Sequence, residues 1–124
     1  MTVFVVQQPR PFRDRHSQQL RFPDLTPAAS YGTVAFVFEE GDQPCLQPGP
    51  SFIKARKALK EFSDDDYLCW AGGDPVGLSI ASMVAADINR GRVRFLRWER
   101  NSKRMEGMGG AGGFYLPVDL KLHV

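Results

Sequence analysis

The chain has 124 residues, of which 43% are hydrophobic and 24% charged, and its formal net charge is +2. This length and balance are typical of one small globular domain, so we expect a single domain over residues 1–124 and exclude a disordered tail, a fibre and a disulfide scaffold. Two cysteines, no run of about 18 apolar residues and no signal-peptide pattern over residues 1–6 together indicate a cytoplasmic protein without a membrane segment.

Two apolar runs separated by a proline-rich segment make up the first part of the chain. Residues 3–6 are predicted as a short strand. Residues 33–38 are nearly all apolar, with β-branched and aromatic side chains, which predicts a strand buried on both faces. Between them, residues 9–30 hold four prolines among polar residues and are predicted as an irregular arm or long loop. Residues 41–50 are predicted as a second loop.

A helix is predicted over residues 52–62, with Ser51 as its N-cap. Its apolar residues recur at helical spacing and form one face: Phe52, Ala55, Leu59 and Phe62. The acidic run at residues 64–66 ends this helix. Neighbouring side chains of an extended segment point in opposite directions, so we interpret the run as a solvated turn and predict no metal site.

A strand over residues 67–71 and a second helix follow. Asp74 is predicted as the N-cap of that helix, Pro75 as its first residue, and Gly91 as the C′ glycine after Asn89. The apolar stripe of this helix is Val76, Ile80, Met83, Val84 and Ile88.

The chain ends in two predicted strands, 93–99 and 114–124, joined by a glycine-rich loop over 101–113 that we expect to be mobile. Strict alternation in the last strand predicts one dry and one wet face, and Pro117 places that strand at a sheet edge. The order of elements predicts an α/β domain with a small mixed sheet of four or five strands, two helices and a C-terminal antiparallel hairpin.

The glycine-rich turn at residues 72–77 is one candidate binding site, because turns from a strand into a helix cradle phosphates. The spacing differs from the dinucleotide and P-loop motifs, and Asp74 would occupy the amide groups that a phosphate needs. A capped structural turn is therefore favoured over a nucleotide or phosphate site. The candidate residues are Gly72, Gly73, Asp74 and Gly77.

The strongest functional indication is a basic stretch over residues 90–104. Seven basic residues and one acid give it a charge of +6, which leaves −4 for the rest of a chain whose total is +2. Arginine with aromatic residues suits a protein partner or single-stranded nucleic acid, while a solvated strand face is the structural alternative. Phe95 and Trp98 fall on opposite faces of the strand. The candidate contact residues are Arg92, Arg94, Arg97, Trp98, Arg100, Lys103 and Arg104.

No catalytic constellation is visible in the sequence. His16 and His123 have no acid or thiol at metal-ligand spacing, and Ser79 and Ser82 lie inside a predicted helix. We therefore predict no catalytic residues, no metal and no cofactor.

Several short segments of the C-terminal half resemble a family of small accessory proteins of T7-like tailed phages, including marine and cyanobacterial ones. The segments are residues 65–68, 73–75, 91–93, 96–100 and 115–120, together with the alanine-rich helix ending at Asn89. The resemblance implies a phage source and no specific activity.

These observations lead to two main functional hypotheses. The first is a non-enzymatic phage accessory protein that binds and modulates a host or phage protein in the host cytoplasm, with self-association open. The alternative is a nucleic-acid-binding protein that uses the basic stretch, where six phosphate contacts would give a log–log salt slope of roughly −4 to −5.

Overall fold

The computed structural model describes residues 1–21, 23–99 and 113–123. They form a mixed five-stranded sheet in the order β4-β1-β5-β6-β7 and a separate two-stranded ribbon, β2-β3. The four strands from β4 to β6 run parallel, and β7 pairs antiparallel with β6. The elements in chain order are β1 (Thr2–Gln7), β2 (Phe12–Arg13), β3 (Leu20–Arg21), α1 (Thr26–Ala29), β4 (Thr33–Phe38), α2 (Pro48–Ala58), β5 (Tyr67–Cys69), α3 (Pro75–Ile88), β6 (Arg92–Glu99) and β7 (Phe114–Lys121). The predicted α/β class, mixed sheet and C-terminal antiparallel hairpin are confirmed.

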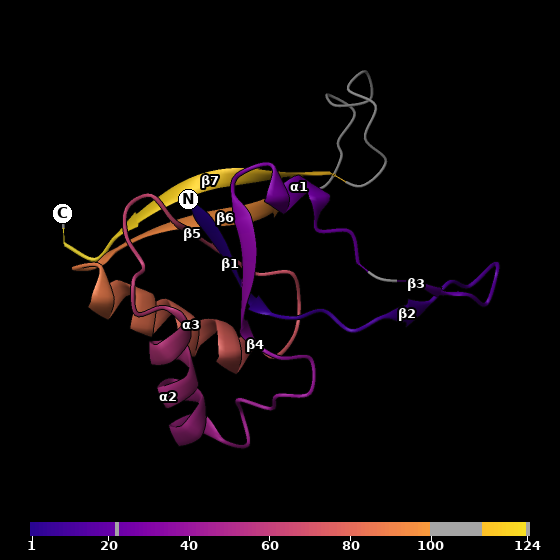
Figure 1. Ribbon diagram of the computed structural model, residues 1–124, viewed down its shortest axis with the longest axis horizontal. Helices are drawn as coiled ribbons and strands as arrows, with labels where there is room; N and C mark the ends of the chain where they lie inside the picture. Colours follow the sequence, from indigo (N-terminus) through magenta and orange to yellow (C-terminus); the bar gives the residue numbers. More distant parts are fainter. Residues whose placement is uncertain (22, 100–112, 124) are drawn as a thin grey trace.

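Helices cover the two faces of the sheet unequally. Helices α2 and α3 lie together on one face, while the short α1 lies on the other (Figure 1). The larger core cluster joins α2 and α3 to side chains such as Val6, Leu68 and Val93. The smaller cluster joins α1 to Val5 and Leu96 on the opposite face. We call these the helix face and the α1 face.

The start of α3 follows the sequence prediction closely. Asp74 has extended backbone angles and accepts a hydrogen bond from the Val76 amide at 2.9 Å, and Pro75 is the first helical residue. At the other end, Asn89 is the C-cap and Arg90 adopts a left-handed conformation with φ of 58°. The C′ position therefore belongs to Arg90, one residue before the predicted Gly91. Gly91 is also left-handed, with φ of 79°, and its amide donates to the Ala86 carbonyl as the helix ends.

The segment over residues 9–30 contains regular structure that its composition did not predict. It forms the β2-β3 ribbon, which extends away from the main sheet, and then α1, which packs Ala28 against the α1 face (Figure 1). Leu20 and Phe12 of the ribbon remain exposed. The segment thus projects as an arm, with short regular pieces only at Phe12–Arg13, Leu20–Arg21 and Thr26–Ala29. The predicted loop over 101–113 lies outside the described residues except for Gly113.

Three local predictions are corrected. Strand β4 is an edge strand, so Thr33 and Phe36 are exposed and the expected burial on both faces is wrong. Helix α2 begins at Pro48 with Gln47 as its N-cap, because proline fits the first helical turn, and Ser51 lies buried inside it. On α3, Val76 and Met83 of the predicted apolar stripe are exposed.

Candidate functional site

The basic strand β6 presents its arginines on both faces of the sheet. Arg92, Arg94 and Trp98 lie on the α1 face, whereas Arg97 lies on the helix face with Phe95. Trp98 packs edge-on against Tyr115 with ring centroids 4.8 Å apart. The structure therefore divides the predicted contact residues between two surfaces. Arg100, Lys103 and Arg104 lie outside the described residues.

Each described arginine of β6 has an acidic neighbour. Arg92 pairs with Asp64 at 3.1 Å, Arg97 with Glu99 at 2.7 Å, and Arg94 with Asp119 at 3.5 Å. The guanidinium of Arg94 also lies 4.5 Å from the ring centre of Tyr67 and donates to the Tyr67 hydroxyl and the Asp64 carbonyl. These contacts reduce the positive field that the arginines would offer to phosphates.

The acidic run at residues 64–66 has a structural role. Asp66 is buried, and its carboxylate accepts hydrogen bonds from the amides of Thr2 and Ser63. Asp64 faces Arg92 on another surface, so the carboxylates diverge as the sequence indicated, but the predicted solvated turn is wrong for Asp66. Within the described residues, no group of three metal-ligating side chains could hold a metal ion.

A row of apolar side chains on β7 is exposed on the helix face. Val93 and Phe95 of β6 lie opposite Leu120 and Val118, which places these β7 residues on the side of α3. Helix α3 does not reach across them, and Leu116, Leu120 and Leu122 are 39%, 50% and 70% exposed. The prediction that this side of the strand is dry is therefore wrong. We call Leu116, Val118, Leu120 and Leu122 the leucine face.

The leucine face continues onto α3 through a hollow of about 700 Å³. Leu122 and Met83 both line this hollow, and Met83 is 61% exposed. Arg90 lines it as well and has no ion-pair partner among residues 1–21, 23–99 and 113–123. Asp87 lines the hollow too and pairs with Arg56 at 3.1 Å. An exposed apolar surface of this kind is typical of a site that binds another protein.

The glycine-rich turn at residues 72–77 is held by its own carboxylate. One oxygen of Asp74 accepts from the Val76 amide, and the other accepts from the Cys45 amide at 2.8 Å. The Cys45 thiol and these bonds hold the pKa of Asp74 below its usual value. Gly77 faces inward, where a Cβ would lie 3.2 Å from Pro44. The carboxylate therefore satisfies the helix N-terminus that a phosphate would need.

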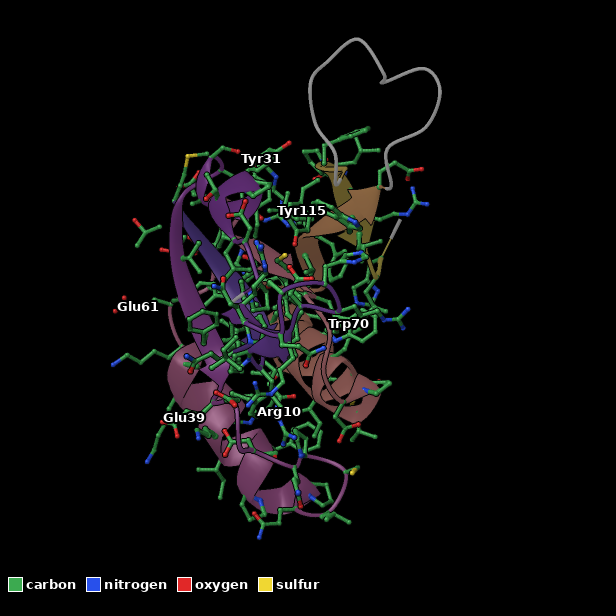
Figure 2. The ribbon with its side chains drawn as sticks, turned by 90° about the vertical axis from the view of Figure 1, so that its right-hand side faces the viewer. Arg10, Tyr31, Glu39, Glu61, Trp70 and Tyr115 are labelled. Carbon is green, nitrogen blue, oxygen red and sulfur yellow. The ribbon has the colours of Figure 1, made fainter. Side chains whose placement is uncertain are left out.

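A separate crevice lies beside this turn, at the carboxyl ends of the parallel strands. It has a volume of about 570 Å³ and is walled by the segments after β1, β4 and β5. The chain leaves β1 toward the α1 face and leaves the neighbouring β5 toward the helix face. Adjacent strands whose connections diverge in this way form the usual ligand crevice of α/β sheets. Gly72, Gly73, Asp74 and Arg10 line it, and Figure 2 shows Arg10 on this side of the molecule.

Gln7 organises the floor of the crevice and was not singled out from the sequence. It is 7% exposed, and its Nε2 donates to the carbonyl oxygens of Asp42 at 2.8 Å and Glu39 at 3.2 Å. Its Oε1 accepts from the Asp74 amide at 3.4 Å. A Cβ on Gly73 would lie 2.6 Å from that oxygen, so this glycine permits the close approach. The Gln7 side chain thus links the end of β1 by hydrogen bonds to the segments that follow β4 and β5.

The two thiols differ in environment. Cys69 is buried in β5, and burial raises its pKa to about 11. Cys45 is exposed at the crevice, and its hydrogen bond to the Asp74 carboxylate raises its pKa. Neither environment favours the thiolate that nucleophilic catalysis requires.

Within residues 1–21, 23–99 and 113–123, every helix is too short or too polar to span a membrane.

Comparison with known proteins identifies the family. No curated protein and no solved structure matches the chain. The family model described as Phage Pam3 gp32-like protein matches residues 1–108, which extends the resemblance to phage proteins into the N-terminal half, while the T7-like assignment stays a prediction. The chain therefore belongs to the Phage Pam3 gp32-like protein family.

Proposed function

We propose that this phage-family protein is a non-enzymatic accessory protein that binds a host or phage protein in the host cytoplasm. The observation that carries the proposal is the leucine face with its extension onto α3. Leu116 and Leu120 are exposed on one side of β7, and Leu122, directly after the strand, is exposed next to Met83. Exposed apolar side chains gathered in this way lose stabilising burial unless a partner covers them.

The border of this surface indicates the chemistry of the partner. Arg90 at the end of α3 supplies positive charge beside the hollow, and Arg97 lies on the same face of β6. We therefore expect the partner to present an apolar surface with an acidic residue near Arg90, whereas Arg97 already pairs with Glu99.

A pair of matched variants tests the proposal. Met83 on α3 and Ile53 on α2 are both 61% exposed, so Met83→Asp and Ile53→Asp make equivalent changes at and away from the proposed surface. Tagged wild-type protein and Ile53→Asp should capture the same protein from lysate of infected cells, and Met83→Asp should lose it. Equal capture by both variants refutes the surface, and material that nuclease removes completely favours the nucleic-acid alternative.

A second candidate function is small-ligand binding in the crevice between β1 and β5. Its position at the divergence of two connections and its volume of about 570 Å³ favour this function. Arg10 would contact an anionic group, because Asp74 already occupies the helix N-terminus. Titration calorimetry with adenosine monophosphate should show saturable binding in wild type and none in Arg10→Ala. No saturation in either protein excludes this nucleotide.

A further inference from the structure

Strand β7 is at one edge of the sheet, and every second residue along it directs its backbone groups away from β6. The Leu122 amide donates to the Gly91 carbonyl at 2.7 Å, in line with the pairing of β6 and β7. Antiparallel partners alternate between pairs that exchange hydrogen bonds and pairs that do not. The even-numbered residues of β7 therefore bond to β6, and the odd-numbered residues direct their amides and carbonyls outward.

Two residues limit this outward edge at one end. The Tyr115 carbonyl accepts a hydrogen bond from the Tyr31 hydroxyl at 2.9 Å, and Figure 2 shows the two tyrosines together. Pro117 has no amide hydrogen and offers only its carbonyl. The outward groups of Asp119 and Lys121 remain, with both donors and acceptors.

We propose that β7 pairs antiparallel with β7 of a second copy of this chain, about a two-fold axis at Leu120. In this register, Asp119 lies opposite Lys121 of the second copy, and the symmetry repeats the pair on the other side of the axis. Both residues direct their backbone groups outward, so each pair exchanges two hydrogen bonds. Pro117 then lies beyond the end of the second copy's β7, where no amide is required of it.

The side chains of the two copies are complementary in the same register. On the α1 face, Asp119 meets Lys121 of the second copy. Lys121 lies beside Arg92 in its own hairpin, and no ion pair of Lys121 occurs within the described residues. Asp119 of the second copy would therefore offset the repulsion between Lys121 and Arg92.

The helix face is apolar on both sides of the same axis. Leu120 lies opposite Leu120 of the second copy, and Val118 lies opposite Leu122. In the single chain, Leu120 is 50% exposed and Leu122 is 70% exposed, and these contacts bury part of both side chains. A register shifted by two residues would set Asp119 against itself. Two copies of β7 are thus complementary in charge and in apolar contacts in this register. This self-complementarity favours a second copy of the chain over an unrelated strand as the partner.

Charge reversal across the axis provides the test. Asp119→Lys sets two lysine side chains opposite each other in both pairs, and Lys121→Asp sets two acids opposite each other. Each variant should dissociate a dimer that sedimentation equilibrium shows for wild type, raising its dissociation constant at least about tenfold. An equimolar mixture of the two variants should restore a species of twice the 13.9 kDa chain mass, because all-lysine and all-acid edges then meet.

Controls separate the interface from folding and from total charge. Glu61 is exposed and lies on the side of the molecule away from β7 (Figure 2), so Glu61→Lys makes the same change in net charge as Asp119→Lys and should leave the dimer intact. Circular dichroism of each variant should match wild type. A wild-type monomer at about 1 mM chain overturns the proposal, as does a mixture that stays monomeric while both variants are folded. Sedimentation measures the purified chain alone. The dimer can therefore be refuted or supported whatever the capture experiment with Met83→Asp shows.

Discussion

Replacing Gln7 by glutamate tests the arrangement of the crevice most directly. The substitution keeps the shape of the side chain but replaces the Nε2 donor by a carboxylate oxygen. That oxygen would face the carbonyls of Asp42 and Glu39, which now accept from Nε2 at 2.8 and 3.2 Å. Burial and these dipoles should raise the pKa of the introduced carboxyl above the value of about 4.3 that it has in the unfolded chain.

The expected loss of stability can be worked from these contacts. Two hydrogen bonds at about 0.5–1.5 kcal/mol each give a loss of about 1–3 kcal/mol for Gln7→Met, which removes the donor without adding charge. A pKa raised by about two units costs Gln7→Glu about 3 kcal/mol more once the pH exceeds the folded-state pKa. The raised pKa fixes the sign, because the variant keeps its stability below the unfolded-state pKa and loses it as the pH rises through the folded-state pKa.

Urea unfolding at pH 4 and pH 8 measures this difference. Relative to wild type at each pH, Gln7→Glu should be less stable at pH 8, while Gln7→Met should show the same deficit at both. Gln8 is the exposed neighbour, so Gln8→Glu is the matched control and should change little. A Gln7→Glu variant whose deficit is independent of pH would refute the assigned contacts.

The remaining predictions concern the thiols, the capped turn and the basic strand. Iodoacetamide at pH 8 should modify Cys45 and leave Cys69 unmodified until the protein unfolds, because Cys69 is buried and its pKa is raised to about 11; mass spectrometry of the native protein counts the adducts. Asp74→Asn should speed the modification of Cys45, because removing the carboxylate charge lowers the thiol pKa; rates equal to wild type would contradict the contact. Thermal-shift assays should show no stabilisation of wild type by inorganic phosphate at the turn, and stabilisation abolished by Gly73→Ala would contradict that view. Arg94→Ala should weaken any single-stranded DNA binding by no more than Ile53→Asp does in fluorescence anisotropy at low salt, because Arg94 is engaged by Tyr67 and Asp119; a selective loss would favour the nucleic-acid hypothesis.

Local chemistry explains which parts of the fold could be predicted. The start of α3 depends on adjacent residues, since Asp74 caps the helix and Pro75 begins it. The edge position of β7 followed from Pro117, whose missing amide hydrogen faces outward. Each of these features is set by the residue itself or its near neighbours.

The parts that were not predicted depend on distant residues. Alternation along β7 showed that the leucines share a face, but whether a helix covers them depends on where α3 lies. The pairing of Arg92 with Asp64 joins residues 28 positions apart in the numbering, so the basic stretch looked freer in the sequence than it is. Gln7 gave no indication of its role because its partners are backbone carbonyls of another loop, and carbonyls carry no sequence identity.

The central position of β1 has a consequence for how the chain reaches this structure. Strand β1 pairs with β4 on one side and β5 on the other, so the earliest strand of the chain is completed only by residues near 38 and 69. Every parallel neighbour is joined through a long crossover, and closing such loops before their contacts form slows folding. A nascent chain therefore carries β1 unpaired until β4 has emerged and paired on one side only until β5 follows, and that strand is the place where chaperone binding or misassociation during synthesis would begin.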